Sequence, residues 1–409
     1  MTVWIIEPRD PLIVRDGRPF GPDPGARAMT LSFPFPSTTT GGVRTRAGLN
    51  AHGIFDLSSK EILELKQLNV RGPLLAQLMP DSNDIAPDGW LVPSPFDALP
   101  LPPKQATSSE ENAVLLQQLV PLQLPEGTQT DFDQAGLKLV GMSQPNLGKP
   151  LEELLHYWNW QFFKSWLFDP SQFYGKNISM ATIGQNGPQR EWRIHVSIDA
   201  DREVAKDGML FETSGLEFTS PGKDKQRLKD AQRLALVVDV DDDNRFASRM
   251  REDLASFAGE RRIVSWRKSS RKLPTCPPEL ERIIVENKAC RVFLLTPACF
   301  DNGYLPKQIR TEKDGITTKL EAVATRRPQV VSGWDLENKR PKSSRRLTPA
   351  GTVLFLALKG NEEAMRKWVR SMWMQCISDQ PQDCKDGFGL CVLGTWSGQP
   401  EVMQKGMQL

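Results

Sequence analysis

The stretch Phe33-Pro-Phe-Pro-Ser-Thr-Thr-Thr-Gly-Gly-Val-Arg-Thr-Arg-Ala-Gly48 predicts how the fold begins: an extended segment turns into a helix. Pro36 ends the extended segment, and Ser37 or Thr38 is a suitable N-cap for a helix that runs to about His52. The first turn of such a helix has amide N–H groups without intrahelical partners and carries the positive end of the helix dipole. The segment is therefore a candidate anion-binding site.

Residue types inside this predicted helix suit a ligand that carries phosphates. Gly41 and Gly42 would leave room for a ribose-phosphate backbone, and Arg44 and Arg46 follow one and two turns further in. The alternative interpretation is an ordinary capped helix after a proline-bounded loop, because capping residues are common. The pattern alone leaves both interpretations open.

Length and composition narrow the class of protein. A chain of 409 residues exceeds one ordinary core, so we expect two domains. It has no run of 18 or more apolar residues, and residues 1–7 lack the basic start and apolar core of a signal peptide, so we expect a cytoplasmic protein. Lys and Arg total 52 against 50 acidic residues, a formal charge of +2. Any nucleic-acid site must therefore be a local patch.

Cysteine and histidine usage excludes several kinds of site. The six cysteines lie in the C-terminal third without a C-x-x-C pair, which argues against a zinc ribbon and against a secreted disulfide framework. Only three histidines are present, at positions 52, 156 and 195. We therefore expect reduced thiols, no metal site and no bound cofactor.

The N-terminal segment predicts a strand and an arginine-bearing loop. Residues 3–6 form a short apolar run typical of a buried strand. In the loop of residues 7–20, Arg9, Arg15 and Arg18 alternate with apolar residues and turn formers. Such a loop can lay guanidinium groups along a nucleic-acid backbone, and it can equally be a solvated hairpin.

The middle of the chain changes character. Residues 80–150 hold about a third of the 32 prolines, which predicts an insertion with little regular structure apart from a hairpin near residues 137–140. Residues 151–168 have helical periodicity but are apolar on both sides. We expect a helix enclosed by the protein, with a docking element for another subunit as the alternative.

Residues 190–199 and 208–213 predict two strands joined by a turn. In the first strand Trp192, Ile194, Val196 and Ile198 alternate with Arg193, His195, Ser197 and Asp199. The apolar set is expected to face the core and the polar set a ligand. Residues 234–240 predict a second, stronger strand.

Two stretches predict the same order of helix, glycine turn and strand. The first comprises residues 249–257, 258–262 and 263–266; the second comprises residues 362–376, 386–389 and 390–396. We interpret them as an internal duplication of an α+β unit, with the seam at residues 272–278. Residues 338–346 are the densest basic stretch, and together with Arg326 and Arg327 they would suit either solvent or phosphates.

Several of these segments together resemble the RAMP superfamily. The resemblance rests on Asp10-Pro-Leu-Ile-Val-Arg-Asp-Gly-Arg-Pro-Phe20, Pro36-Ser-Thr-Thr-Thr-Gly-Gly-Val-Arg44, Arg193-Ile-His-Val-Ser-Ile-Asp199 with Gly208-Met-Leu-Phe211, and Gly387-Phe-Gly-Leu390 ahead of Gly394-Thr-Trp396. Their order is most similar to the third Cmr subunit of type III-B CRISPR effector complexes. The match touches both halves of the chain.

The resemblance implies a fold and a role. It implies two tandem ferredoxin-like, RRM-related domains, at residues 1–271 with an insertion at about 80–190 and at residues 272–409, with a C-terminal glycine-rich loop. It also implies a non-catalytic subunit that binds the 5′ handle of the CRISPR RNA (crRNA) beside the Cas10-type large subunit and an adjacent backbone RAMP subunit. Carried over by position, the RNA-binding residues are Arg15, Arg18, Ser37, Thr38, Thr39, Arg44, Arg193, His195, Gly387, Phe388 and Gly389. To these we add Gly41 and Gly42 from the predicted phosphate site, and Arg261 and Arg262 beside the first glycine turn. The chain departs from the family pattern at Ala258, a position that is often glycine.

Two alternatives stay open at this point. RAMP proteins include endoribonucleases that process the CRISPR precursor, and such a reaction needs a general base, for which His52 and His195 are the candidates. A generic single-stranded RNA-binding module would bind unrelated RNAs with comparable affinity. Handle-dependent binding separates this module from the subunit that the resemblance implies.

Overall fold

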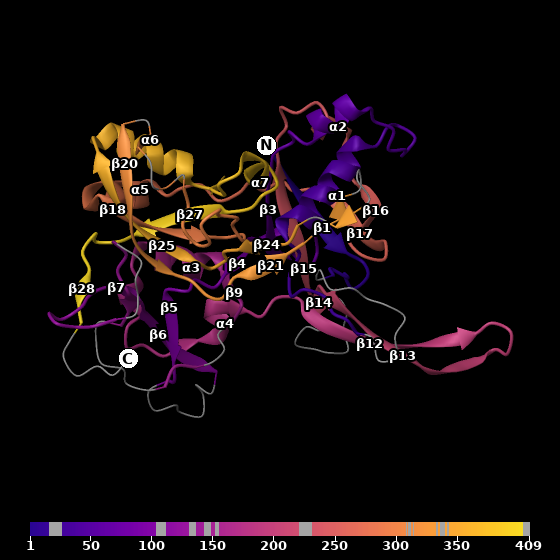
Figure 1. Ribbon diagram of the computed structural model, residues 1–409, viewed down its shortest axis with the longest axis horizontal. Helices are drawn as coiled ribbons and strands as arrows, with labels where there is room; N and C mark the ends of the chain where they lie inside the picture. Colours follow the sequence, from indigo (N-terminus) through magenta and orange to yellow (C-terminus); the bar gives the residue numbers. More distant parts are fainter. Residues whose placement is uncertain are drawn as a thin grey trace. The chain divides into compact units, whose positions relative to one another are not determined.

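The computed structural model (Figure 1) shows a mixed α+β protein made mostly of sheets, as predicted. It describes residues 1–15, 27–103, 112–130, 136–142, 149–151, 155–220, 231–307, 309, 312–313, 315–332, 334–335, 340–341 and 343–403. The chain divides into two compact units. Unit 1 comprises residues 1–89, 187–272 and 330–346, and unit 2 comprises residues 90–186, 273–329 and 347–409. The chain passes from one unit to the other near the predicted seam, while most of the predicted insertion belongs to unit 2.

Unit 1 is built on an antiparallel sheet. Its strands are β1 (Thr2–Pro8), β3 (Val70–Leu78), the first part of β4 (Ile85–Pro93), β15 (Gln232–Val240), β16 (Asp253–Phe257) and β17 (Arg262–Lys268), in the order β4-β3-β15-β1-β17-β16. The helices are α1 (Pro36–Gly48) and α2 (Ser59–Leu65), with a 3₁₀ turn, η3, at Ala247–Arg249. β1 is central because its run of apolar residues is buried on both faces.

The two faces of β1 and β17 have different neighbours. Ile6 pairs with Trp266, and on this face α1 packs through Gly42, where an added Cβ would lie 2.6 Å from the Phe257 ring. Glu7 pairs with Ser265 on the opposite face, where polar side chains gather. The sheet of unit 1 therefore has one tightly packed face and one that carries charge.

The structure corrects the predicted start of α1. The helix begins with Pro36 at its first position, so the N-cap is Phe35, which makes no side-chain cap hydrogen bond. Proline suits this position because its ring fixes φ and it lacks the amide hydrogen that would be unpaired there. Ser37 and Thr38 consequently lie inside the first turn and are not caps. The helix ends at Gly48, four residues before the predicted end.

A long hairpin extends from unit 1. It consists of β12 (Gln189–Asp199) and β13 (Val204–Glu217) (Figure 1). β2 (Arg27–Ala28) pairs in parallel with Glu212 and Thr213 of β13. The strands were predicted, but the expected core face is wrong: the side chains of Trp192, Ile194, Val196 and Ile198 are exposed. Strand alternation defines two faces but does not say which one is covered. Unit 1 also contains β14 (Thr219–Ser220), β22 (Trp334–Asp335) and β23 (Arg340–Pro341).

Unit 2 contains a second antiparallel sheet. Its strands are β18 (Ala289–Leu294), β19 (Glu312–Lys313), β20 (Ile316–Ala324), β25 (Val353–Gly360), β26 (Gln375–Cys376) and β27 (Leu390–Thr395), in the order β19-β20-β25-β18-β27-β26. The helices α5 (Pro278–Asn287), α6 (Glu362–Met372) and α7 (Pro381–Lys385) accompany it. The four central strands follow the same order in both units: second, third, first, fourth along the chain. The two sheets therefore share the order of their central strands, while the predicted repeat of helix, glycine turn and strand is not present in unit 1, where residues 253–257 form β16.

The region from residue 90 to residue 186 is more regular than predicted. It contains the end of β4, β5 (Ala98–Leu101), β6 (Ala113–Gln118), β7 (Val120–Gln123), β8 (Val140–Gly141), β9 (Tyr157–Asn159), β10 (Ile178–Ser179) and β11 (Gly184–Gln185), besides α3 (Trp160–Phe168), η1 (Pro170–Phe173) and α4 (Met180–Ile183). Pro100 is tolerated because β5 is an edge strand that pairs only with β6. β28 (Glu401–Val402) pairs with β7, and β21 (Gln329–Val331) and β24 (Arg345–Leu347) complete the strands.

Two predicted helices are also corrected. Residues 249–257 form η3 and the strand β16, because the turn after Phe257 folds this segment back onto β17 and pairing overrides helical propensity. Within the predicted helix of residues 151–168, Tyr157–Asn159 form the strand β9 and Trp160–Phe168 form α3, whose side chains Trp160, Phe162, Phe163 and Trp166 are buried. No helix in the described part of the chain is long and apolar enough to cross a membrane.

Candidate nucleic-acid interface

Three consecutive residues of the first loop join three separate parts of unit 1. The amide and carbonyl of Leu12 both hydrogen-bond with Leu216 in β13, at 2.9 and 2.8 Å. The carbonyl of Ile13 accepts from the amide of Gly259 at 2.8 Å, and the carbonyl of Val14 accepts from the amide of Leu31 at 2.8 Å. The loop therefore holds the hairpin, the turn at residues 258–262 and the segment that leads into α1.

The turn at residues 258–262 has an unusual backbone. Ala258, Glu260 and Arg261 have φ values of 59°, 55° and 52°, in the left-handed region that side chains other than glycine rarely adopt. Between them, Gly259 lies so close to the loop that an added Cβ would be 2.7 Å from the carbonyl oxygen of Ile13. Such conformations cost about 1–3 kcal/mol each, and they cluster at ligand-binding sites.

This turn brings three of the predicted arginines to one place. Glu260 lies between Arg15, at 3.9 Å, and Arg262, at 3.2 Å. Arg261 is exposed and makes no hydrogen bond or ion pair with any described residue. Glu260 therefore pairs with two arginines, and Arg261, next to it in the turn, is exposed to solvent.

The start of α1 contributes fewer accessible side chains to the candidate interface than the sequence predicts. Thr39 is buried, and its hydroxyl donates to the carbonyl of Phe35 at 3.3 Å. Gly42 faces the Phe257 ring, so its missing side chain makes room for packing and not for a ligand. Arg44 donates to the carbonyls of Lys66 and Leu68, at 3.0 and 3.2 Å, which ties α1 to the end of α2. Gly41, Ser37 and Thr38 retain some exposure.

On the hairpin, the two predicted residues are held by neighbours. Arg193 donates to both carboxylate oxygens of Glu191, at 2.8 and 3.2 Å, and these bonds raise the pKa of Arg193. The ring of His195 stacks on Phe211 with centroids 5.0 Å apart, and its Nε2 lies 2.8 Å from the hydroxyl of Thr213. Both side chains are therefore oriented by the hairpin itself.

The predicted glycine loop of unit 2 is buried. Phe388 is fully buried, and the carbonyl of Gly387 accepts from the Thr296 hydroxyl at 2.7 Å. The amide of Gly389 donates to the carbonyl of Pro297 at 2.8 Å. Arg18 lies outside the described residues, as do several residues of the basic stretch at 338–346.

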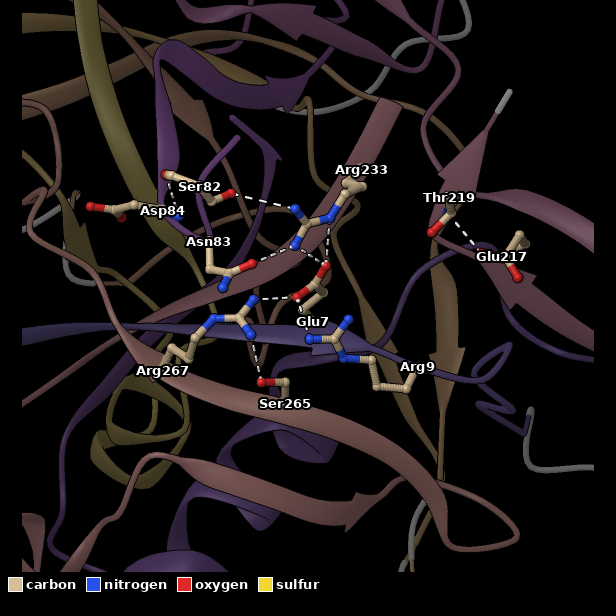
Figure 2. Close-up of polar contacts among 10 residues, drawn as sticks. All are labelled: Glu7, Arg9, Ser82, Asn83, Asp84, Glu217, Thr219, Arg233, Ser265 and Arg267. Atoms are coloured by element: carbon tan, nitrogen blue, oxygen red, sulfur yellow. Dashed lines mark hydrogen bonds and ion pairs between the residues drawn. The ribbon is translucent and has the colours of Figure 1, made fainter. Parts of the chain in front are cut away.

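Sequence reasoning missed a second group of arginines in unit 1, on the charged face of the sheet (Figure 2). Arg233 of β15, Arg267 of β17 and Arg9 of the first loop all approach the buried carboxylate of Glu7. Arg233 lies 2.6 Å from Glu7 and also donates to Asn83 at 2.9 Å. Arg233 and Arg267 are 226 and 260 positions away from Glu7 along the chain, so no spacing in the sequence indicates the group.

The charge balance at Glu7 follows from these contacts. Burial would raise the pKa of Glu7, but the hydrogen bonds from Arg267 and Arg233 outweigh it and lower the pKa below its ordinary value. One ionised carboxylate then faces three guanidinium groups, a surplus of two positive charges. The Nε of Arg267 is buried without a hydrogen-bond partner among the described residues. This face can therefore attract an anion.

The fold is that of an α+β protein with two sheet units. Its first unit carries two groups of arginines, one at the turn of residues 258–262 and one around Glu7. A family model described as CRISPR-associated protein (Cas_Cmr3) matches residues 4–396. The chain therefore belongs to this family, and the resemblance to the third Cmr subunit is confirmed.

Solved structures give a distant likeness. One match is a chain of a type III-B Cmr-beta complex bound to cognate target RNA and AMPPnP, with a TM-score of 0.44, 15% identity, and coverage of 90% of this chain and 87% of that chain. Another is a chain of the same type of complex bound to cognate target RNA, with a TM-score of 0.44, 16% identity and 86% coverage of both chains. No curated protein matches the chain.

Proposed function

We propose that this protein is a non-catalytic subunit of a type III-B CRISPR effector complex that binds the crRNA 5′ handle and docks on the Cas10-type large subunit, next to a backbone RAMP subunit. Membership of the Cas_Cmr3 family supports the role in a CRISPR effector. The shared strand order of the two sheets supports two ferredoxin-like domains, each with one of the two helices that such a domain has between its strands: α1 in unit 1 and α6 in unit 2.

The observation that carries the RNA-binding part is the turn at residues 258–262. Its left-handed residues hold Arg261 exposed beside Arg15 and Arg262, in direct contact with the loop at residues 12–14. Arginine side chains and exposed main-chain groups bind phosphates, and they fix the position of a strand without reading its bases. We therefore assign the phosphates of the handle to Arg15, Arg261 and Arg262.

Catalysis is not part of this proposal. A ribonuclease base must reach the ribose 2′-hydroxyl with a cation close by to stabilise the phosphorane. His195 is stacked on Phe211 and bound to Thr213, and its neighbour Arg193 is occupied by Glu191. His52 is exposed, four residues after the end of α1, and is not among the residues to which we assign the handle.

The proposal is tested by removing the two most accessible charges. In a type III-B complex reconstituted with the full chain, Arg15→Ala with Arg261→Ala should weaken crRNA retention by at least about tenfold at moderate salt, because two charge-assisted contacts are lost. The dependence of log K on log salt should fall by about 2, one for each lost phosphate contact. Fluorescence anisotropy with labelled crRNA measures both quantities.

The control removes one charge elsewhere. Arg282 is exposed on α5 and pairs with Glu286 one turn away, so Arg282→Ala should leave the affinity and the salt slope unchanged. An RNA with an altered handle should bind the parent more weakly than the natural crRNA. Equal retention of both RNAs, or an unchanged salt slope in the double variant, contradicts the proposal.

A further inference from the structure

One side of the hairpin exposes a continuous set of apolar side chains. Trp192, Ile194, Val196 and Ile198 alternate along β12, and Leu210 of β13 pairs directly with Val196. Their exposed fractions lie between 44% and 72%. These five residues are called the apolar hairpin face below. Large side chains gathered in this way on a protein surface mark an interaction site.

Contacts elsewhere in the hairpin explain how it can fold while the apolar hairpin face stays exposed to solvent. On the opposite side, His195 stacks on Phe211 and contacts Thr213, so that side has its own packing. The base of the hairpin is fixed by Leu216, through two hydrogen bonds to Leu12, and by the Ser214 hydroxyl, which accepts from the amide of Thr30 at 2.9 Å. The apolar hairpin face is thus held in place without being part of the core.

Charge identifies the kind of partner. Residues 189–217 carry four basic and seven acidic side chains, a net charge of −3, and at the tip Asp199, Asp201, Glu203 and Asp207 outnumber Arg202 and Lys206. A polyanion would be repelled by this charge. The face is also mostly aliphatic, whereas nucleic-acid bases are bound by stacking on aromatic or arginine planes. An apolar protein surface with cations at its edge complements both features.

We propose that the apolar hairpin face docks onto an apolar strip of a neighbouring protein subunit, and that the acidic tip meets basic residues at the edge of that strip. The inference rests on the proposed function in so far as the neighbour is another subunit of the type III-B complex. It adds the surface used, the chemistry of the partner surface and the statement that the hairpin contacts protein and not RNA.

The test uses the remaining subunits of the type III-B complex, co-expressed with a crRNA, as the probe. Ile194→Ser with Ile198→Ser should weaken the binding of the full chain to this assembly by at least about tenfold, because two apolar side chains that the interface would bury are replaced by hydroxyl groups that must lose their water. Both residues are more than 60% exposed, so the variant should fold as the parent does. Circular dichroism checks the fold, and biolayer interferometry measures the affinity.

Further variants show whether a loss of binding comes from the apolar hairpin face itself. Ile54 and Leu63 are also exposed apolar residues of unit 1, and Ile54→Ser with Leu63→Ser should bind the assembly as the parent does. Asp201→Lys with Asp207→Lys should slow association, and the difference should shrink as salt is added. The hairpin variants should retain the crRNA contact of the chain, measured by photo-crosslinking to the handle.

Each outcome decides the proposal. Unchanged binding of the Ile194/Ile198 variant overturns it, as does an equal loss in the Ile54/Leu63 control. A crosslink from the hairpin to RNA that disappears in the variant would show a nucleic-acid surface instead, and a parent dimer that the variant abolishes would show self-association. Failure of the parent itself to enter the assembly refutes the proposed function, and this result is distinct from a failure of the hairpin variants alone.

Discussion

Both units bury carboxylates that bind arginine, and the centre at Glu7 in unit 1 differs in charge balance from the centre at Asp97 in unit 2. In unit 2, Asp97 and Arg291 are both fully buried and lie 2.7 Å apart. Asp97 also accepts from the indole of Trp166, and Arg291 donates its other hydrogens to main-chain carbonyls, so every charge has its partner. In unit 1, Glu7 faces three arginines that keep partial exposure. The Asp97–Arg291 pair therefore stabilises the fold, whereas the additional arginines at Glu7 can also bind an anionic ligand.

The strongest way to test this comparison is to break the balanced centre. Asp97→Ala leaves the guanidinium of Arg291 buried without a countercharge, which should cost about 3–5 kcal/mol of unfolding free energy. Urea unfolding followed by tryptophan fluorescence measures it. Glu286→Ala, which breaks the exposed pair with Arg282, should change stability by less than about 1 kcal/mol. Equal effects of the two changes would mean that burial does not distinguish these pairs.

Glu7→Gln addresses the other centre and should cost less, about 1–3 kcal/mol, because its arginines can turn toward water. The lowered pKa of Glu7 also sets a pH dependence. Its stabilising effect is complete above the ordinary glutamate pKa and is lost as the pH falls through the lower value in the folded protein. The parent should therefore lose more stability than the variant on acidification from about pH 6 to about pH 3, as measured by urea midpoints. Parallel loss in both proteins would contradict this role for Glu7.

The smallest effect should come from the packed face of the same sheet. In Gly42→Ala the new methyl group would lie 2.6 Å from the Phe257 ring, and overpacking costs about 1–3 kcal/mol. The higher helical propensity of alanine offsets about 0.8–1 kcal/mol of this cost, so the substitution should lower the stability of the protein. At Gly41 an added Cβ would meet no described atom within 4 Å, so Gly41→Ala should raise the melting temperature. If both substitutions stabilise the protein, the contact between α1 and Phe257 is not tight.

The elements that the sequence predicts best are those with strong local patterns. The strand at β1, the helix α1 and the two hairpin strands were all predicted from apolar runs or periodicity. Their surroundings were not predictable, since alternation in β12 defines two faces without stating what covers either. Prolines misled the interpretation of residues 80–150, because an edge strand such as β5 accepts Pro100.

For the candidate site, too, the sequence predicted individual residues better than their surroundings. Arg15 was predicted from the family pattern and Arg261 from its place beside the first glycine turn, and the structure brings the loop and the turn that carry them into contact. Arg233 and Arg267 were missed because only the pairing of β15 and β17 with β1 brings them to Glu7. Thr39 and Phe388 were expected at the surface and are buried, since a residue type does not reveal which side of its element faces the core.

The tripeptide at residues 12–14 has a mechanical consequence. Its hydrogen bonds tie the base of the hairpin, the strained turn and the segment before α1 to one short piece of backbone, and all three of its side chains are buried. A displacement imposed on the hairpin by a neighbour would therefore be transmitted to the arginines of the turn through these hydrogen bonds and a short stretch of backbone. The binding of a neighbouring subunit at the hairpin and the binding of the guide strand at the turn would then be mechanically coupled through residues 12–14.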